Sequence, residues 1–154
     1  MKKLPLLLML STTTSMLVGL LLRRLLSDPV DPQAFLELRV LLPLILVMPF
    51  LETLLIHFLI VEAFLRIGNG RTVALYLGLV LSSSCFFFLH YAMNGAFNGF
   101  VYGLVGGVFL SVMYGWSRGD GRQAAFFNTW MLHAASNVIL VISMAFYGMA
   151  IGRL

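Results

Sequence analysis

The chain has 154 residues, of which 60% are hydrophobic and 10% charged, and its net charge is +4. Soluble domains carry about a quarter charged residues, so this composition excludes an ordinary water-soluble domain. The single Cys85 excludes an intrachain disulfide framework and a zinc site built from several thiolates. We predict one all-α domain over residues 1–154, a polytopic transmembrane helical bundle surrounded by lipid.

The first apolar run covers residues 4–22 and lies between Lys2-Lys3 and Arg23-Arg24. It lacks a clear small-x-small cleavage site, so we expect an uncleaved first span and not a signal peptide. The segment Asp28-Pro29-Val30-Asp31-Pro32 follows. Each proline lacks a backbone donor and pushes its predecessor out of the helical region, which predicts a polar turn.

The second apolar run covers residues 35–67 and is too long for a straight crossing. At 1.5 Å per residue it would reach about 50 Å, whereas the hydrocarbon core is about 30 Å thick. Pro43 and Pro49 lie inside the run, where proline frees backbone carbonyls that must find other donors. We therefore predict a bend just before Glu52, which suits a polar cavity.

A third span is predicted over residues 72–93, after the break Gly68-Asn69-Gly70-Arg71. Residues 94–98 form an uncharged turn, and a fourth span covers residues 99–116. The fourth span carries Gly99, Gly103, Gly106 and Gly107. Glycines about four apart let helix backbones approach closely in lipid, so this helix should pack tightly.

The polar loop 117–123 precedes a fifth span over residues 124–151, which gives five spans in all. In this arrangement the amino terminus and the loops after the second and fourth spans share one side. The basic residues on or next to that side are Lys2, Lys3, Arg66, Arg71, Arg118 and Arg122, and those on the other are Arg23, Arg24, Arg39 and Arg153. This excess favours a cytoplasmic amino terminus and explains the positive charge without nucleic-acid binding.

Titratable side chains inside a span are costly, so each one needs a partner or a function. The acids and histidines well inside the predicted spans are Glu52, His57, Glu62, His90 and His133. Glu62 lies near a helix end and can reach the interface. Glu52 lies deeper, which makes it the stronger candidate for a functional group.

The candidate chemistry comes from three helices. His133 and Asn137 are four residues apart and share a helical face, so they can converge with Glu52 and His90 on one cavity. A carboxylate held away from bulk water can take a proton from a water molecule that a histidine holds. The second histidine and the amide can then donate to the oxyanion that forms on the attacked carbonyl.

Other polar and aromatic residues have simpler expected roles. Hydroxyls in spans usually bond helical carbonyls, which we expect of Ser82, Ser83, Ser84 and Ser136. We expect packing or interface roles for the aromatic residues Tyr91, Tyr114, Trp116 and Trp130. We expect Asn94 and Asn98 to lie in the turn. His57 is about 140 degrees around the helix from Glu52, so it need not face the same cavity, and we expect a structural or supporting role for it.

The order of these motifs resembles the CAAX-protease and bacteriocin-processing family of glutamic-type intramembrane proteases. That family carries Glu-Glu-x-x-x-Arg, Phe-x-x-x-His and His-x-x-x-Asn on successive membrane helices. The counterparts begin at Glu52, Phe86 and His133, and the similarity covers roughly residues 49–141. The first span, 4–22, lies outside this core.

The resemblance implies that Glu52 is the catalytic glutamate, that His90 helps to activate water, and that His133 and Asn137 form the oxyanion site. Thr53 and His57 stand where the family has its second glutamate and its arginine. With Phe86, they are candidates for supporting roles. The resemblance further implies a bacterial cytoplasmic membrane protein that needs no cofactor and cleaves a membrane-associated peptide or protein tail.

Three other hypotheses remain open. Glu52, His90 and His133 could bind zinc with water in the fourth position, although the chain lacks a His-Glu-x-x-His helix. The chain could instead be a non-catalytic immunity or partner-binding module that keeps the family core, its polar residues only joining the helices. A proton-coupled transporter would also use buried acids and histidines, but no inverted repeat is evident. The sequence does not indicate an oligomeric state.

Overall fold

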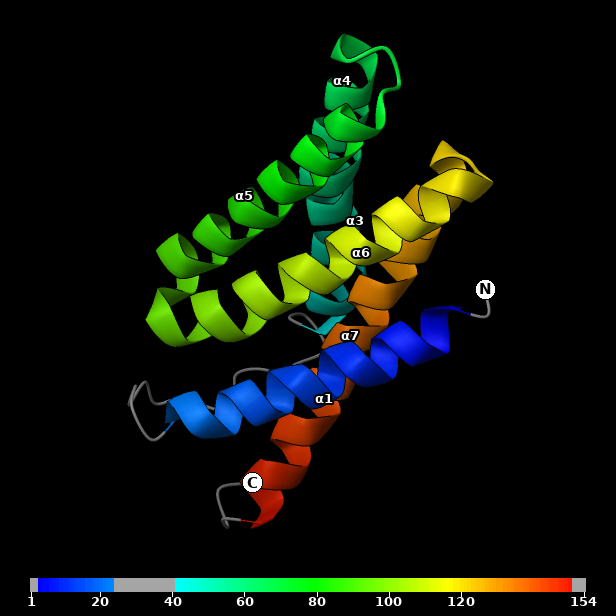
Figure 1. Ribbon diagram of the computed structural model, residues 1–154. Coiled ribbons are helices and arrows are strands. Elements are labelled where there is room, and N and C mark those ends of the chain that lie inside the picture. The colour runs from blue at the N-terminus through cyan, green and yellow to red at the C-terminus, as the bar shows by residue number, and fades with distance from the viewer. Residues whose placement is uncertain (1–2, 24–40, 151–154) are drawn as a thin grey trace.

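The computed structural model describes residues 3–23 and 41–150, and these residues form helices and short turns without a strand (Figure 1). The α-helices are α1 Lys3–Arg23, α3 Met48–Glu52, α4 Leu59–Ile67, α5 Thr72–Asn98, α6 Gly107–Ser117 and α7 Arg122–Ala150. Three π-helical segments and one 3-10 turn complete the order: η2 Pro43–Val47, η3 Thr53–Phe58, η4 Gly99–Gly106 and η5 Arg118–Asp120. The predicted all-α class is confirmed.

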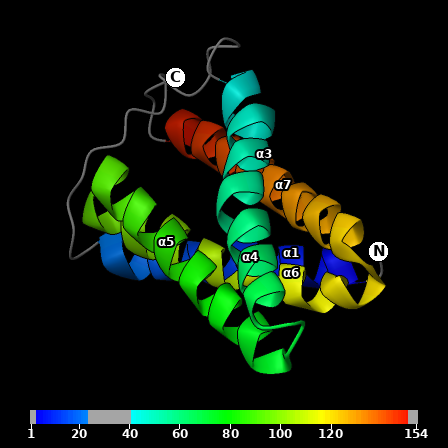
Figure 2. The same cartoon turned by 90° about the horizontal axis from the view of Figure 1, so that it is seen from above.

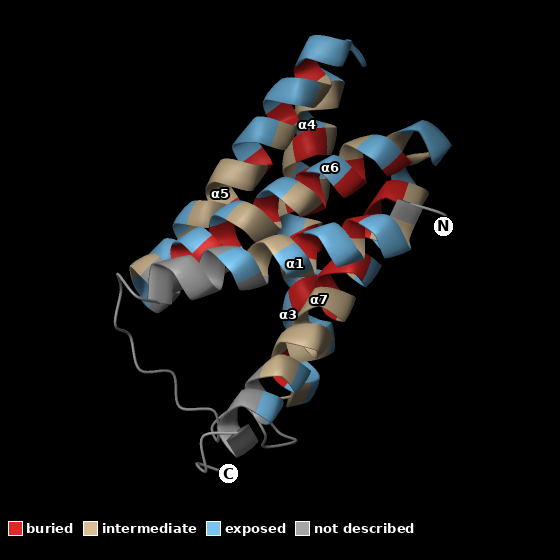
Figure 3. Cartoon of the chain, turned by 60° about the horizontal axis from the view of Figure 1, so that its bottom comes forward, coloured by how far each residue is buried: buried red, intermediate tan, exposed pale blue. Residues whose placement is uncertain are grey.

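Four helical segments are long and apolar enough to cross a membrane, namely Pro43–Ile67, Thr72–Met93, Gly99–Asp120 and Arg122–Ser143. The predicted first span, residues 4–22, coincides with helix α1, Lys3–Arg23. Buried residues face the spaces between helices, while the outward faces are exposed (Figure 3). These outward faces carry many large apolar side chains, as expected of a multi-pass membrane protein. The predicted turn 28–32 and residues 35–40 lie outside the described residues.

The crossing helices pack as neighbours in the chain and also as distant partners. In Figure 1, α5 and the η4–α6 helix run side by side, and α6 pairs with α7. The helix over residues 43–67 crosses α7 and α5, with α1 and α6 beneath it (Figure 2). This arrangement places the middle of the 43–67 helix against three other helices, which is where the candidate residues lie.

The 43–67 helix changes its hydrogen bonding twice around its prolines. Wider π-helical turns, Pro43–Val47 and Thr53–Phe58, flank the short α-helical stretch Met48–Glu52. In the first of them the Met48 N–H donates to the Pro43 carbonyl, five residues back. A π turn therefore precedes Glu52, where the sequence predicted a bend, and a second π turn follows it.

Small residues hold η4 and α6 tightly against α5, as the glycine spacing predicted. The chain reverses at Gly95, whose φ of 81° suits glycine and few other residues. A Cβ added to Gly99 would lie 2.8 Å from the Tyr91 Cα. One added to Gly103 would lie 2.9 Å from the His90 Cβ, so this contact fixes the backbone beside His90.

Replacing Gly103 by alanine should lower stability by about 1–3 kcal/mol, because the new methyl group overpacks the contact with α5. Gly106→Ala is the matched control, since its Cβ would meet Phe86 at an ordinary 3.8 Å. Unfolding of both variants in one detergent, followed by circular dichroism, measures the difference. Equal stability of the two variants would contradict the close packing.

An ion pair joins the 43–67 helix to the end of α6. Arg118 donates from Nε to Glu62 Oε1 at 2.6 Å and from Nη2 to Glu62 Oε2 at 3.1 Å. The Tyr114 hydroxyl donates to the same Oε1 at 2.9 Å. Bidentate pairs of this kind are geometrically specific. The pair therefore attaches the turn between α6 and α7 to α4 near one end of the bundle.

Candidate active site

Glu52 and His133 meet between two helices in the apolar part of the bundle. Glu52 is the last residue of α3, directly before the π turn, and His133 lies on α7. His133 Nε2 is 3.4 Å from Glu52 Oε2, and their side chains are 7% and 15% exposed. A carboxylate and an imidazole at this distance, largely removed from water, can share or exchange a proton.

His90 is positioned by Phe86, one turn earlier on α5. The two rings pack with their centroids 4.4 Å apart, and the Phe86 ring also meets His133 edge-on at 5.3 Å. His90 Nδ1 lies 3.1 Å from the Phe86 carbonyl oxygen, which can only accept, so Nδ1 donates. In the neutral ring this leaves Nε2 as an acceptor, able to hold a water molecule by one of its protons.

Asn137 lies one turn after His133 on α7, as the spacing predicted. Its Nδ2 donates to the Leu44 carbonyl of the 43–67 helix at 2.8 Å. The amide expected to stabilise an oxyanion therefore binds backbone in this structure. The Asn137 side chain has a second N–H on Nδ2, which the bond to Leu44 does not use.

Thr53 and His57 are fully buried on the π turn that follows Glu52. His57 Nδ1 lies 3.3 Å from the Ser82 hydroxyl and 3.4 Å from that of Ser111. The His57 ring lies 5.4 Å from that of Phe86, so the ring contacts of Phe86 reach three imidazoles. Within the described residues, Thr53 Oγ1, His57 Nε2 and His133 Nδ1 have no hydrogen-bond partner.

The structure thus pairs Glu52 directly with His133, and it packs His90 and His133 against the same Phe86 ring. Asn137 instead binds the Leu44 carbonyl. No protein-family model matches the chain, and neither a curated protein nor a solved structure is significantly similar to it.

The alternative zinc site requires three donor side chains close together. Among residues 3–23 and 41–150, no three side chains of His, Cys, Asp or Glu lie close enough together to hold one metal ion. Glu52, His90 and His133 therefore do not form a ligand set in this arrangement.

The expected role of the serines is confirmed where the structure gives their bonds. Ser82 donates to the Leu79 carbonyl at 3.0 Å, and Ser84 donates to that of Val80 at 2.9 Å. Ser111 donates to the Leu79 carbonyl across helices and was not anticipated. Nothing in the sequence around Ser111 indicates its contact with His57.

The aromatic residues pack as expected, with one addition. Trp130 lies edge-on to Phe50 at 5.6 Å and near Phe127, and its Nε1 donates to the Leu46 carbonyl at 3.4 Å. Tyr91 packs on Phe87. Tyr114 is buried and bonds Glu62, a contact that the sequence did not reveal. The side chains of Asn94 and Asn98 lie outside the described residues.

Proposed function

We propose that the chain is an intramembrane endopeptidase of the glutamate type, which hydrolyses a peptide bond with an activated water molecule. The observation that carries this proposal is the contact between the Glu52 carboxylate and the His133 imidazole. Ionisable side chains are costly to place inside a bilayer, and those found there are usually paired with one another and mark functional sites. The resemblance to the CAAX-protease and bacteriocin-processing family supports the same chemistry.

In the proposed reaction, water binds between Glu52 and the acceptor Nε2 of His90. Glu52 takes a proton as the water oxygen attacks the carbonyl carbon of the peptide, and it then delivers that proton to the leaving nitrogen. The C–N bond breaks, leaving a carboxylic acid and an amine. For His133 to donate to the developing oxyanion, its Nε2 must turn from Glu52 towards the substrate.

The membrane defines the expected substrate and location. We propose a membrane-associated peptide or protein tail, cleaved in the bacterial cytoplasmic membrane with the amino terminus of the enzyme on the cytoplasmic side. The loops after α4 and α6 lie near one another through the Glu62–Arg118 pair. Arg66, Arg71 and Arg122 near these loops are exposed, which supports placing this end in the cytoplasm.

A second candidate is a non-catalytic immunity or partner-binding module. The observations that favour it are that Asn137 already binds the Leu44 carbonyl and that His133 faces Glu52. Polar groups that satisfy one another can serve helix association alone. In that case the chain would bind a membrane partner without cleaving it.

The deciding experiment uses the full chain in nanodiscs with a panel of membrane peptides. Wild type should produce cleaved fragments by mass spectrometry, with or without a zinc chelator, and Glu52→Ala should produce none. Cleavage lost on chelation would replace the proposal with a metal mechanism. Folded wild type that cleaves no peptide in a broad panel would favour the non-catalytic module.

A further inference from the structure

The backbone carbonyl of Leu44 has lost both donors that a helix normally offers. In an α-helix its donor would be the N–H of Met48, but that N–H bonds the Pro43 carbonyl instead. In a π turn its donor would be the residue five places on, which is Pro49, and proline has no N–H. A carbonyl left without a donor inside a membrane costs free energy, so Leu44 needs a donor from elsewhere.

The side chain of Asn137 supplies that donor. Its Nδ2 lies 2.8 Å from the Leu44 oxygen, and Asn137 is partly buried. A second side chain of α7 makes a similar bond, because Trp130 Nε1 donates to the Leu46 carbonyl. Two side chains of α7 thus bind carbonyls of the proline-containing turn.

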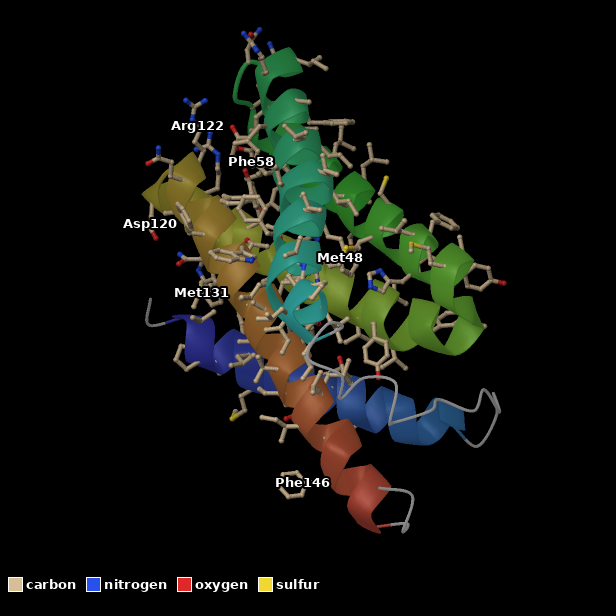
Figure 4. All side chains as sticks on the ribbon, turned by 180° about the vertical axis from the view of Figure 1, so that it is seen from behind. Met48, Phe58, Asp120, Arg122, Met131 and Phe146 are labelled. Atoms are coloured by element: carbon tan, nitrogen blue, oxygen red, sulfur yellow. The ribbon has the colours of Figure 1, made fainter. Side chains whose placement is uncertain are left out.

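The same two elements carry Glu52 and His133. Glu52 follows Leu44 by eight residues, about two turns, and His133 precedes Asn137 by four residues, about one turn, so the Leu44–Asn137 bond joins the same two elements that carry the reacting groups. Figure 4 shows the 43–67 helix lying across α7, with Met48 labelled on it. The Leu44–Asn137 bond therefore sets how the turn before Glu52 meets α7.

We propose that Asn137 is a positioning residue, whose amide replaces the N–H that Pro49 lacks and so holds Glu52 opposite His133. This role differs from a direct contact with an oxyanion, because it acts through the Leu44 backbone. Its structural part is independent of the proposed protease activity, and its effect on cleavage rests on that activity. Pro49 and Asn137 should therefore compensate for one another when they are changed together.

A cycle of variants tests this compensation. Asn137→Ala should lower the thermal midpoint by about 3–6 °C, because the Leu44 carbonyl then lacks a donor. Adding Pro49→Ala restores a backbone N–H five residues after Leu44, and should recover at least half of that loss. Pro43→Ala with Asn137→Ala is the control, since a helical carbonyl takes its donor from a residue later in the chain, and an N–H at position 43, before Leu44, should recover nothing. If Asn137→Ala does not fold, the folded yield on gel filtration gives the same comparison.

Cleavage per folded molecule is the second readout. Recovery of both stability and cleavage in Pro49→Ala/Asn137→Ala supports a positioning role. Losses that simply add in the double variant, or recovery with Pro43→Ala, would overturn the compensation. Recovered stability with cleavage still lost would overturn the positioning role and assign Asn137 to the reacting atoms. If wild type cleaves nothing, the proposed function fails, and the stability cycle still decides whether Asn137 replaces the Pro49 donor.

Discussion

Exchanging Glu52 for glutamine is expected to lower the rate of peptide cleavage by a factor of about 10² to 10⁴, the range typical of a lost general base. The amide has the size of the carboxylate but cannot take a proton from water. Because glutamine can still contact His133 Nε2, the variant should fold as the wild type does. Initial cleavage rates in nanodiscs, normalised to folded protein, measure the effect.

Glu62→Gln is the matched control, because Glu62 is the other acid within the same helix and also contacts side chains of other helices. It should weaken the fold but leave the cleavage rate per folded molecule within about twofold of wild type. Glu62 and Glu52 contact different side chains, so changes at the two sites should act independently. A Glu52→Gln variant as active as the wild type would remove Glu52 from the mechanism. Equal losses of activity in both variants would assign the effect to folding.

Replacing Glu62 by leucine is expected to destabilise the protein by about 2–3 kcal/mol. The change leaves the Arg118 guanidinium and the Tyr114 hydroxyl without their acceptor. Removing one partner of a fully buried pair costs about 3–5 kcal/mol, and this pair is partly exposed, so a smaller effect follows. The free energy of unfolding by SDS in mixed micelles is the appropriate measurement.

The double variant Glu62→Leu/Arg118→Leu separates pairing from packing. With both charges removed, no unpaired guanidinium remains, and an apolar replacement of an ion pair is often close to neutral. At least half of the lost stability should therefore return. A double variant less stable than Glu62→Leu alone would show that Arg118 contributes something other than the pair.

The helices could be predicted from hydropathy because length and apolar character decide membrane crossing, and the tight packing of α5 on η4 followed from the spacing of glycines. The shared face of His133 and Asn137 followed from helical periodicity, and α7 places both towards the 43–67 helix. These features depend on residues close in the sequence, or on one residue type at regular intervals.

The partners of these residues could not be predicted in the same way. Nothing local in the sequence pairs Asn137 with Leu44, 93 residues away, or Arg118 with Glu62, 56 residues away. Such contacts depend on how whole helices cross. The oxyanion role expected of Asn137 rests on the order and spacing of motifs. Motifs do not reveal that the Leu44 carbonyl on another helix can accept the same N–H.

The two wide turns around Glu52 make the direction of its carboxylate sensitive to chain length. A π turn contains one more residue than the α turn it replaces, and each residue in an α-helix rotates the chain by about 100 degrees. Deleting a single residue between Thr53 and His57 would therefore turn Glu52 away from α7 relative to α4, while keeping every side chain of the site. Homologues that align without gaps across this stretch would keep Glu52 in place, and one with a gap there would not, even if it retained the same motif.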